Sequence, residues 1–129
     1  MGAYRHAVML DPGMVAALVN LANLYYARDA IVEAEALYEK ALGLDDGCFE
    51  ALFNLGNVHH DTGRFDEAVR RYEEALRIDP GYADAHFYLA VALEKLGRSA
   101  DARPHWQAYQ RLAPHGEWVE LAKEFSSQG

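Results

Sequence analysis

Apolar residues recur at helical spacing on both sides of a glycine in residues 49–82. Residues 50–61 place four of them and one histidine on one helix face: Ala51, Leu52, Leu55, Val58 and His59. Gly63 follows, and glycine commonly ends a helix because it adopts positive φ angles without strain. A second stripe then runs up to Pro80: Ala68, Tyr72, Ala75, Leu76 and Ile78. The pattern predicts two helices of about 14 residues joined by a tight turn.

Each unit ends in a similar short sequence, in which Pro12, Asp46, Pro80 and Pro114 follow one another at intervals of 34 residues. A fixed period of this length indicates one supersecondary unit that is repeated. Each unit must stack on a neighbour because it cannot bury its apolar face alone. The period therefore predicts a solenoid, an architecture that mostly presents binding surfaces.

The residues shared by the units resemble the tetratricopeptide repeat signature. In residues 49–82 these are Leu52, Leu55, Gly56, His59, Gly63, Ala68, Tyr72, Ala75 and Pro80. The resemblance extends to residues 15–48 and 83–116, and it implies an all-α, right-handed solenoid of antiparallel helix pairs forming one domain over residues 1–129. Small residues recur at Ala22, Gly56 and Ala90, and again at Ala34, Ala68 and Ala102, where paired helices are expected to approach closely.

Departures from the repeat predict where the array is irregular. Asp29 stands at a turn position that is glycine in the other units, which aspartate tolerates at some strain. Pro104 is expected to remove one hydrogen bond and kink its helix. Tyr109 replaces a small residue, so we expect the regular array to end there. Residues 117–127 then form a capping helix with a covering face of Trp118, Leu121, Ala122 and Phe125.

The N-terminal residues 1–14 match only the second helix of a unit, through Tyr4, Ala7 and Leu10. One explanation is that the chain is a fragment of a longer array or of a multidomain protein. Another is self-association, in which these three residues meet a second molecule in a dimer or stack. A third is that the chain is the regulatory tail of a larger protein, such as a bacterial transcription regulator.

The resemblance implies a concave groove lined by the first helices, which would bind a peptide or protein. Carried over by register, the partner-binding residues are Val19, Asn20, Asn23, Tyr26, Glu50, Phe53, Asn54, Asn57, His60, Asp61, Asp84, Phe87, Tyr88, Val91 and Glu94. Val19, Phe53 and Phe87 form an apolar row flanked by carboxylates, which suits a ligand with apolar anchors and basic flanks. The alternative is that Phe53 and Phe87 pack against the neighbouring unit.

Asparagines recur in this groove, since Asn20 and Asn23 are repeated as Asn54 and Asn57. They resemble the asparagine ladder of O-linked N-acetylglucosamine transferases, which binds peptide backbone. The alternative is that each amide bonds to an adjacent turn. The sequence disfavours a chaperone-type clamp for a C-terminal carboxylate, because Asp84 stands where that clamp needs a cation.

Charge and residue content limit the kinds of partner and the compartment that we expect for this chain. The formal net charge of -8 disfavours nucleic acid and anionic membrane surfaces. No stretch has the roughly 18 uncharged apolar residues of a membrane helix. The single cysteine, Cys48, fits a reducing compartment, so we expect a cytoplasmic protein.

Catalytic chemistry has little support in the sequence. His59, His60 and Asp61 are consecutive and point around a helix, and His59 is expected to be packed and hydrogen-bonded. Cys48 has no histidine fixed near it by spacing, and phosphate-binding glycine loops are missing. We therefore expect a non-catalytic scaffold or interaction module with no metal and no cofactor.

Overall fold

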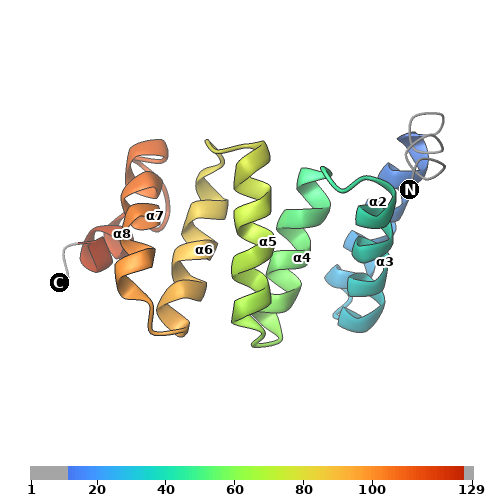
Figure 1. Cartoon of the computed structure of the whole chain (residues 1–129), viewed down its shortest axis with the longest axis horizontal. Coiled ribbons are helices and arrows are strands. Elements are labelled where there is room, and N and C mark those ends of the chain that lie inside the picture. Colours follow the sequence, from blue (N-terminus) through green and yellow to red (C-terminus); the bar gives the residue numbers. More distant parts are fainter. Residues whose placement is uncertain (1–11, 127–129) are drawn as a thin grey trace.

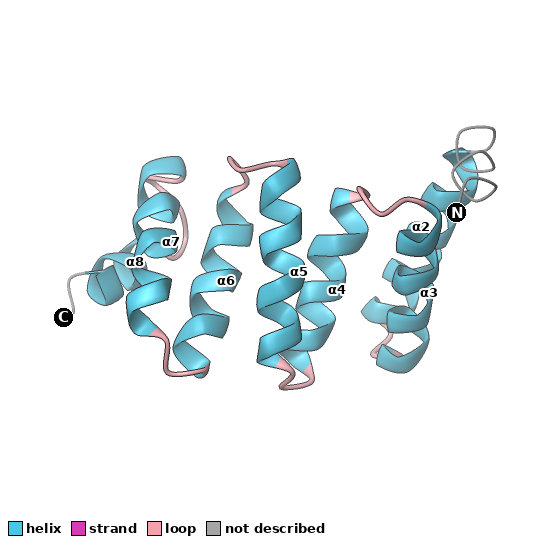
Figure 2. Cartoon of the chain, viewed as in Figure 1, coloured by secondary structure: helices cyan, strands magenta, loops and turns pink. Residues whose placement is uncertain are grey.

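The computed structural model describes residues 12–126, which fold into helices joined by short turns (Figure 2). The helices are α2 (Pro12–Ala27), α3 (Ile31–Leu44), α4 (Phe49–Asp61), α5 (Phe65–Ile78), α6 (Ala83–Lys95), α7 (Ser99–Leu112) and α8 (Val119–Ser126). Over this range no β-strand is present. The candidate self-association residues Tyr4, Ala7 and Leu10 lie outside the described residues.

The helices pack in adjacent pairs, α2 with α3, α4 with α5 and α6 with α7, and each second helix also packs on the first helix of the next unit. Figure 1 shows the pairs side by side in one row, with α2 and α3 at one end and α8 at the other. The predicted all-α solenoid of the tetratricopeptide type is therefore confirmed. α8 packs on α7, as a capping helix should.

The turns inside the three pairs use the positive φ angles that the sequence predicted. Gly63 and Gly97 have φ angles of 77° and 74°, and Asp29 adopts 64° at the equivalent position of the first unit. An L-residue with a side chain is disfavoured in this region, and aspartate is one of the few that enter it. The first unit therefore makes the same turn as the others at a higher conformational cost.

Two prolines lie within described helices. Pro12 is the first residue of α2, and the helix that the sequence predicts before it lies outside the described residues. Residues 12–14 thus belong to α2, so the predicted boundary after residue 14 falls inside this helix. Pro104 lies inside α7, which nevertheless runs without interruption from Ser99 to Leu112.

Close helix approach explains the small residues at the pair contacts. A Cβ atom added to Gly56 would lie 2.7 Å from Cε1 of Tyr72, so the tyrosine ring rests directly on the α4 backbone. The alanines at the other contact positions have no exposed surface: Ala22, Ala34, Ala68, Ala90 and Ala102. Replacing any of them by a larger side chain should overpack the pair.

The C-terminal end is closed by aromatic side chains. Trp106 is almost fully buried and stacks on Phe125 of α8 with ring centroids 5.0 Å apart. A Cβ on Gly116 would lie 2.4 Å from the Tyr109 hydroxyl, so glycine is needed beside that ring. Ala122 is fully buried, as expected for the covering face. Leu121 was predicted to belong to the same face, but it is 37% exposed.

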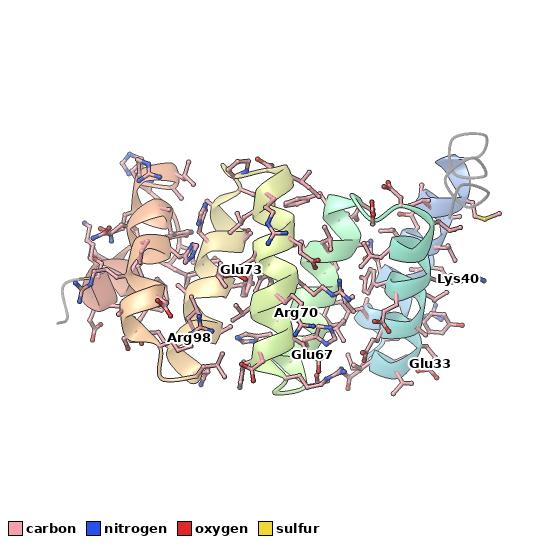
Figure 3. All side chains as sticks on the ribbon, in the orientation of Figure 1. Glu33, Lys40, Glu67, Arg70, Glu73 and Arg98 are labelled. Atoms are coloured by element: carbon pink, nitrogen blue, oxygen red, sulfur yellow. The ribbon has the colours of Figure 1, made fainter. Side chains whose placement is uncertain are left out.

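Charged side chains cover the outward sides of the second helices (Figure 3). α5 alone contains Asp66, Glu67, Arg70, Arg71, Glu73, Glu74 and Arg77. By contrast, the sequence of α2 has no Asp, Glu, Lys or Arg from Pro12 to Ala27. The highly charged helix α5 and the uncharged helix α2 therefore belong to neighbouring units.

Candidate functional site

The first helices α2, α4 and α6 carry the predicted groove, and its N-terminal part is a hydrogen-bonded network centred on Asn23. The Asn23 Oδ1 atom accepts from the Tyr38 hydroxyl and, at 3.0 Å, from Nδ2 of Asn54. Its own Nδ2 donates to Oε2 of Glu50 at 3.1 Å. Tyr38 is fully buried, so its hydroxyl needs a partner inside the protein. Burial also raises the pKa of Tyr38 to about 12.

The same arrangement recurs one unit later, where the Tyr72 hydroxyl donates to Oδ1 of Asn57 at 2.6 Å. In the third unit valine replaces the asparagine and tryptophan replaces the tyrosine. The Trp106 Nε1 atom donates instead to Oε2 of Glu94, at 3.0 Å. The asparagines do not bond to an adjacent turn; they satisfy the phenol of a buried tyrosine 15 residues later. The joint change of both residues in the third unit is a sequence signal for this pairing.

The groove asparagines differ in which of their amide oxygen and nitrogen atoms remain free for a ligand. Asn23 uses both its oxygen and its nitrogen within the chain. The Asn57 oxygen is occupied, while its nitrogen and the whole exposed Asn20 amide have no hydrogen bond to any residue that the structure describes. Any backbone ladder would thus rely on Asn20, Asn54 and Asn57 rather than on Asn23.

Four rings form the middle of the groove, and we call them the aromatic centre: Phe49, Phe53, Tyr82 and Tyr88. Phe53 lies 5.2 Å from Tyr82 and 5.9 Å from Tyr88 between ring centroids, and Phe49 lies 4.9 Å from Tyr82. Tyr82 is 36% exposed, and the other three are half-buried. Sequence analysis missed Phe49 and Tyr82, which flank the junctions of units rather than the predicted helix face.

Carboxylates surround this aromatic centre from three elements. Burial raises the pKa of the Tyr88 phenol, and Asp84 of α6, Asp61 of α4 and Glu117 before α8 raise it further. Asp61 also accepts a hydrogen bond from the Tyr26 hydroxyl of α2. Burial lowers the pKa of the neighbouring His60, so this side chain adds no positive charge at neutral pH. The middle of the groove is therefore aromatic with an acidic rim.

Two residues of the predicted apolar row are largely buried. Val19 is 3% exposed and packs in the N-terminal core, yet it also lines a hollow with Asn20 and Glu50. Phe87 is 7% exposed, stacks on Trp118 with centroids 4.1 Å apart and meets Trp106 edge-on at 5.7 Å. Phe87 is therefore not an exposed groove residue, because neighbouring segments cover it. The alternative that Phe87 packs against the following segment is the one observed.

A hollow lies at each side of the aromatic centre, in equivalent registers. The N-terminal hollow, about 320 Å³, is lined by Asn23, Tyr26, Ala27 and Asn54. The C-terminal hollow, about 240 Å³, is lined by Val91, Glu94, Lys95, Trp106, Leu121 and Phe125. Sequence analysis missed the contribution of Leu121 and Phe125, whose place depends on how α8 packs on α7. Asparagine amides line part of the N-terminal hollow, whereas apolar side chains line most of the C-terminal one.

The candidates for chemistry, His59, His60 and Cys48, are buried or half-buried. His59 is 2% exposed, as predicted, but its Nδ1 has no hydrogen-bond partner among the described residues and lies 4.0 Å from Glu35. Burial lowers the pKa of His59 and raises that of the Cys48 thiol. Arg64 donates two hydrogen bonds to Glu35, at 2.9 and 2.6 Å, and so connects the first two units. The described residues contain no cluster of three potential metal ligands.

No helix within residues 12–126 is long and apolar enough to cross a membrane.

Solved structures with the same fold are numerous. The chain superposes with a TM-score of 0.83 on the first tetratricopeptide domain of Spaghetti bound to an HSP90 peptide, at 17% identity, covering 88% of this chain and 91% of that one. For YrrB, described as having an unusual peptide-binding site, the TM-score is 0.78 at 28% identity, with 96% and 62% covered. For the Yersinia enterocolitica secretion chaperone SycD with a peptide of the translocator YopD, it is 0.75 at 25% identity, with 87% and 86% covered.

Comparison with family models agrees with the structural similarity over most of the chain, although no curated protein sequence matches. Models of the tetratricopeptide repeat match residues 15–44 and 84–115, and a further TPR repeat model matches residues 56–97. These matches fall on the helix pairs α2–α3, α4–α5 and α6–α7. The chain therefore belongs to the tetratricopeptide repeat family.

Proposed function

We propose that the chain is a non-catalytic protein-interaction module that binds an extended peptide segment across the aromatic centre. The observation that carries the proposal is the aromatic centre, whose partly exposed rings lie 4.9–5.9 Å apart between centroids. The negative charges of Asp84, Asp61 and Glu117 act on it, since they raise the pKa of Tyr88. Aromatic faces attract cations, and a rim of carboxylates strengthens that attraction. The partner segment therefore has basic residues beside apolar ones. The single cysteine supports a cytoplasmic setting as part of the same proposal.

The two hollows would receive different parts of the peptide segment. Apolar side chains of the peptide would enter the C-terminal hollow between Val91 and Leu121. The N-terminal hollow would receive peptide backbone, near Tyr26 and Asn54. YrrB, described as having a peptide-binding site, and SycD with its bound peptide, at 28% and 25% identity, support peptide recognition in general and do not specify this chemistry.

A fluorescence anisotropy titration with two labelled peptides tests the proposal. One peptide alternates leucine with arginine, and the other replaces every arginine by glutamate. We expect the arginine peptide to bind with a micromolar dissociation constant, about -8 kcal/mol, and to weaken as salt is added. Tyr82→Ala should weaken binding about tenfold by removing an exposed ring.

Asp84→Asn isolates the acidic rim, and Glu33→Gln is its matched control because both remove one negative charge. Glu33 lies on α3, on the charged side of the molecule (Figure 3). We expect Asp84→Asn to weaken the arginine peptide several-fold and Glu33→Gln to leave it unchanged. Equal affinity for the glutamate peptide, or equal effects of the two substitutions, would refute the proposal.

A further inference from the structure

α2 has an exposed apolar face of four residues, and the counterparts of three of them are buried in the other units. We call it the α2 outer face, and it consists of Met14, Ala17, Leu21 and Leu24, spaced three and four residues apart. Met14, Leu21 and Leu24 are 50%, 43% and 56% exposed. Single exposed apolar residues are common on proteins, but these lie on one helix face and form a continuous strip.

The equivalent strip of the next units lies inside the core. In α4, the residues in register with Ala17, Leu21 and Leu24 are Ala51, Leu55 and Val58, and none has exposed surface. In α6 they are Ala85, Leu89 and Ala92, again with no exposed surface. α3 covers the strip of α4, and α5 covers that of α6. The α2 outer face is therefore a helix-packing surface that no described element covers.

Charge makes this face suitable for contact with an identical chain. The chain carries a net charge of -8, so two copies repel one another over most of their surfaces. α2 contains no charged residue in its sequence, whereas the second helices display many (Figure 3). Two copies can meet α2 to α2 without burying a carboxylate or placing like charges in contact.

The competing occupant is the chain's own N-terminal segment, because Tyr4 and Leu10 are in register with Tyr38 and Leu44 of α3. The start of α2 argues against it. α4 and α6 begin at residues 49 and 83, which in register correspond to residue 15, yet α2 begins at Pro12. Residues 12–14, in register with the turn between α3 and α4, are helical instead. The three residues in register with the turn before α4 are therefore helical in α2, which differs from the connection that places α3 on α4.

We propose that the α2 outer face is an interface with a second copy of this chain. The two α2 helices pack antiparallel about a two-fold axis, with Leu21 near its centre. The spacing of three and four residues is that of a helix–helix seam. One helix face per copy is smaller than a stable interface, so we expect a weak dimer with a dissociation constant of roughly 10 µM to 1 mM.

Sedimentation velocity on the full chain, from about 10 µM to 1 mM, tests this interface. We expect the average mass of the wild-type chain to rise toward that of a dimer, and Leu21→Glu combined with Leu24→Glu to remain a monomer. Val32→Glu is the control, because Val32 is 78% exposed on α3, away from the α2 outer face. It should dimerise like the wild type. Circular dichroism of all variants verifies that each remains helical.

Two results would overturn the proposal. The first is a wild-type chain that stays monomeric over the whole range. Slow amide hydrogen exchange in residues 4–10 would then identify the N-terminal segment as the occupant. The second is a dimer that persists in the Leu21→Glu and Leu24→Glu variant, since both glutamates would lie in the proposed interface.

Discussion

The two ends of this solenoid differ in whether a described element covers their apolar surface. At the C-terminal end, Phe87 is buried by Trp118, and Trp106 stacks on Phe125 of α8. At the N-terminal end, Leu21 and Leu24 of α2 remain about half exposed. Both ends inherit an apolar surface from the repeat, but only one has a described covering element. The burial of a repeat residue is thus decided by its neighbour and not by its position in the unit.

The cap should account for the largest difference in stability between the ends. Trp118→Ala removes the ring stacked on Phe87 and should lower the free energy of unfolding by about 2–4 kcal/mol. Leu24→Ala at the uncovered end should change it by about 0.5 kcal/mol or less, because little buried contact is lost. Urea denaturation of both variants measures the difference. Similar losses for the two would mean that the α2 outer face is already covered in solution.

A histidine pair gives the C-terminal unit a pH dependence that the first unit lacks. His86 and His105 stand where the first unit has Leu18 and Leu37, and their Nδ1 atoms are 3.0 Å apart. The His86 Nε2 atom lies 2.8 Å from the Pro80 carbonyl oxygen, so it donates there and leaves Nδ1 to accept from His105. In this arrangement one hydrogen bond, from His105 to His86, joins the two rings.

Stability should consequently fall on acidification. Burial first, and then His86, lower the pKa of His105 from 6.5 to about 4, with Asp101 acting in the opposite direction. Between these values the unfolded chain binds more protons than the folded one, so stability is present above pH 6.5 and is lost progressively toward pH 4. We expect a loss of about 1–3 kcal/mol from this pair, measured by urea denaturation at pH 7.5 and pH 4.5.

Replacing the pair by the residues of the first unit provides the test. His86→Leu with His105→Leu should remove this part of the pH dependence, while His115→Gln at an exposed position should keep it. His59 and His60 will leave a remainder, since burial lowers their pKa values too. An unchanged pH slope in the double variant would refute the assignment.

The smallest expected difference concerns the turns of the first and third units. Asp29→Gly should stabilise the chain by about 0.5 kcal/mol, because glycine relieves the positive φ angle but adds freedom to the unfolded state. The reciprocal Gly97→Asp should destabilise it by about 1 kcal/mol. Thermal melting measures both. Shifts of the same sign would show that the two turns are not equivalent.

Much of the fold was predictable because the same residue pattern occurs in three successive units. Gly63, Gly97 and Asp29 mark the turns, and the recurring alanines mark the close helix contacts. The groove was less predictable. Register placed Phe53 and Phe87 on the same face, yet one is half-buried in the aromatic centre and the other lies under Trp118. A sequence period cannot express this difference, since it arises from the element that follows.

The asparagines illustrate a second limit. Their spacing indicated a shared face, but the partners were the hydroxyl groups of Tyr38 and Tyr72 on the second helices. A buried phenol must have a hydrogen-bond partner, yet which amide supplies it depends on the distance between two packed helices. That distance is a property of the pair and not of either helix.

By itself the sequence determined the class of fold, the helix pairs, the turns and the absence of charge along α2, because local spacing and residue type decide these features. The tertiary structure alone decided which apolar positions are buried, which amides are occupied and where the hollows lie, because these depend on contacts between helices. The α2 outer face belongs to both: its composition is written in the sequence, and its exposure appears only when the units are stacked.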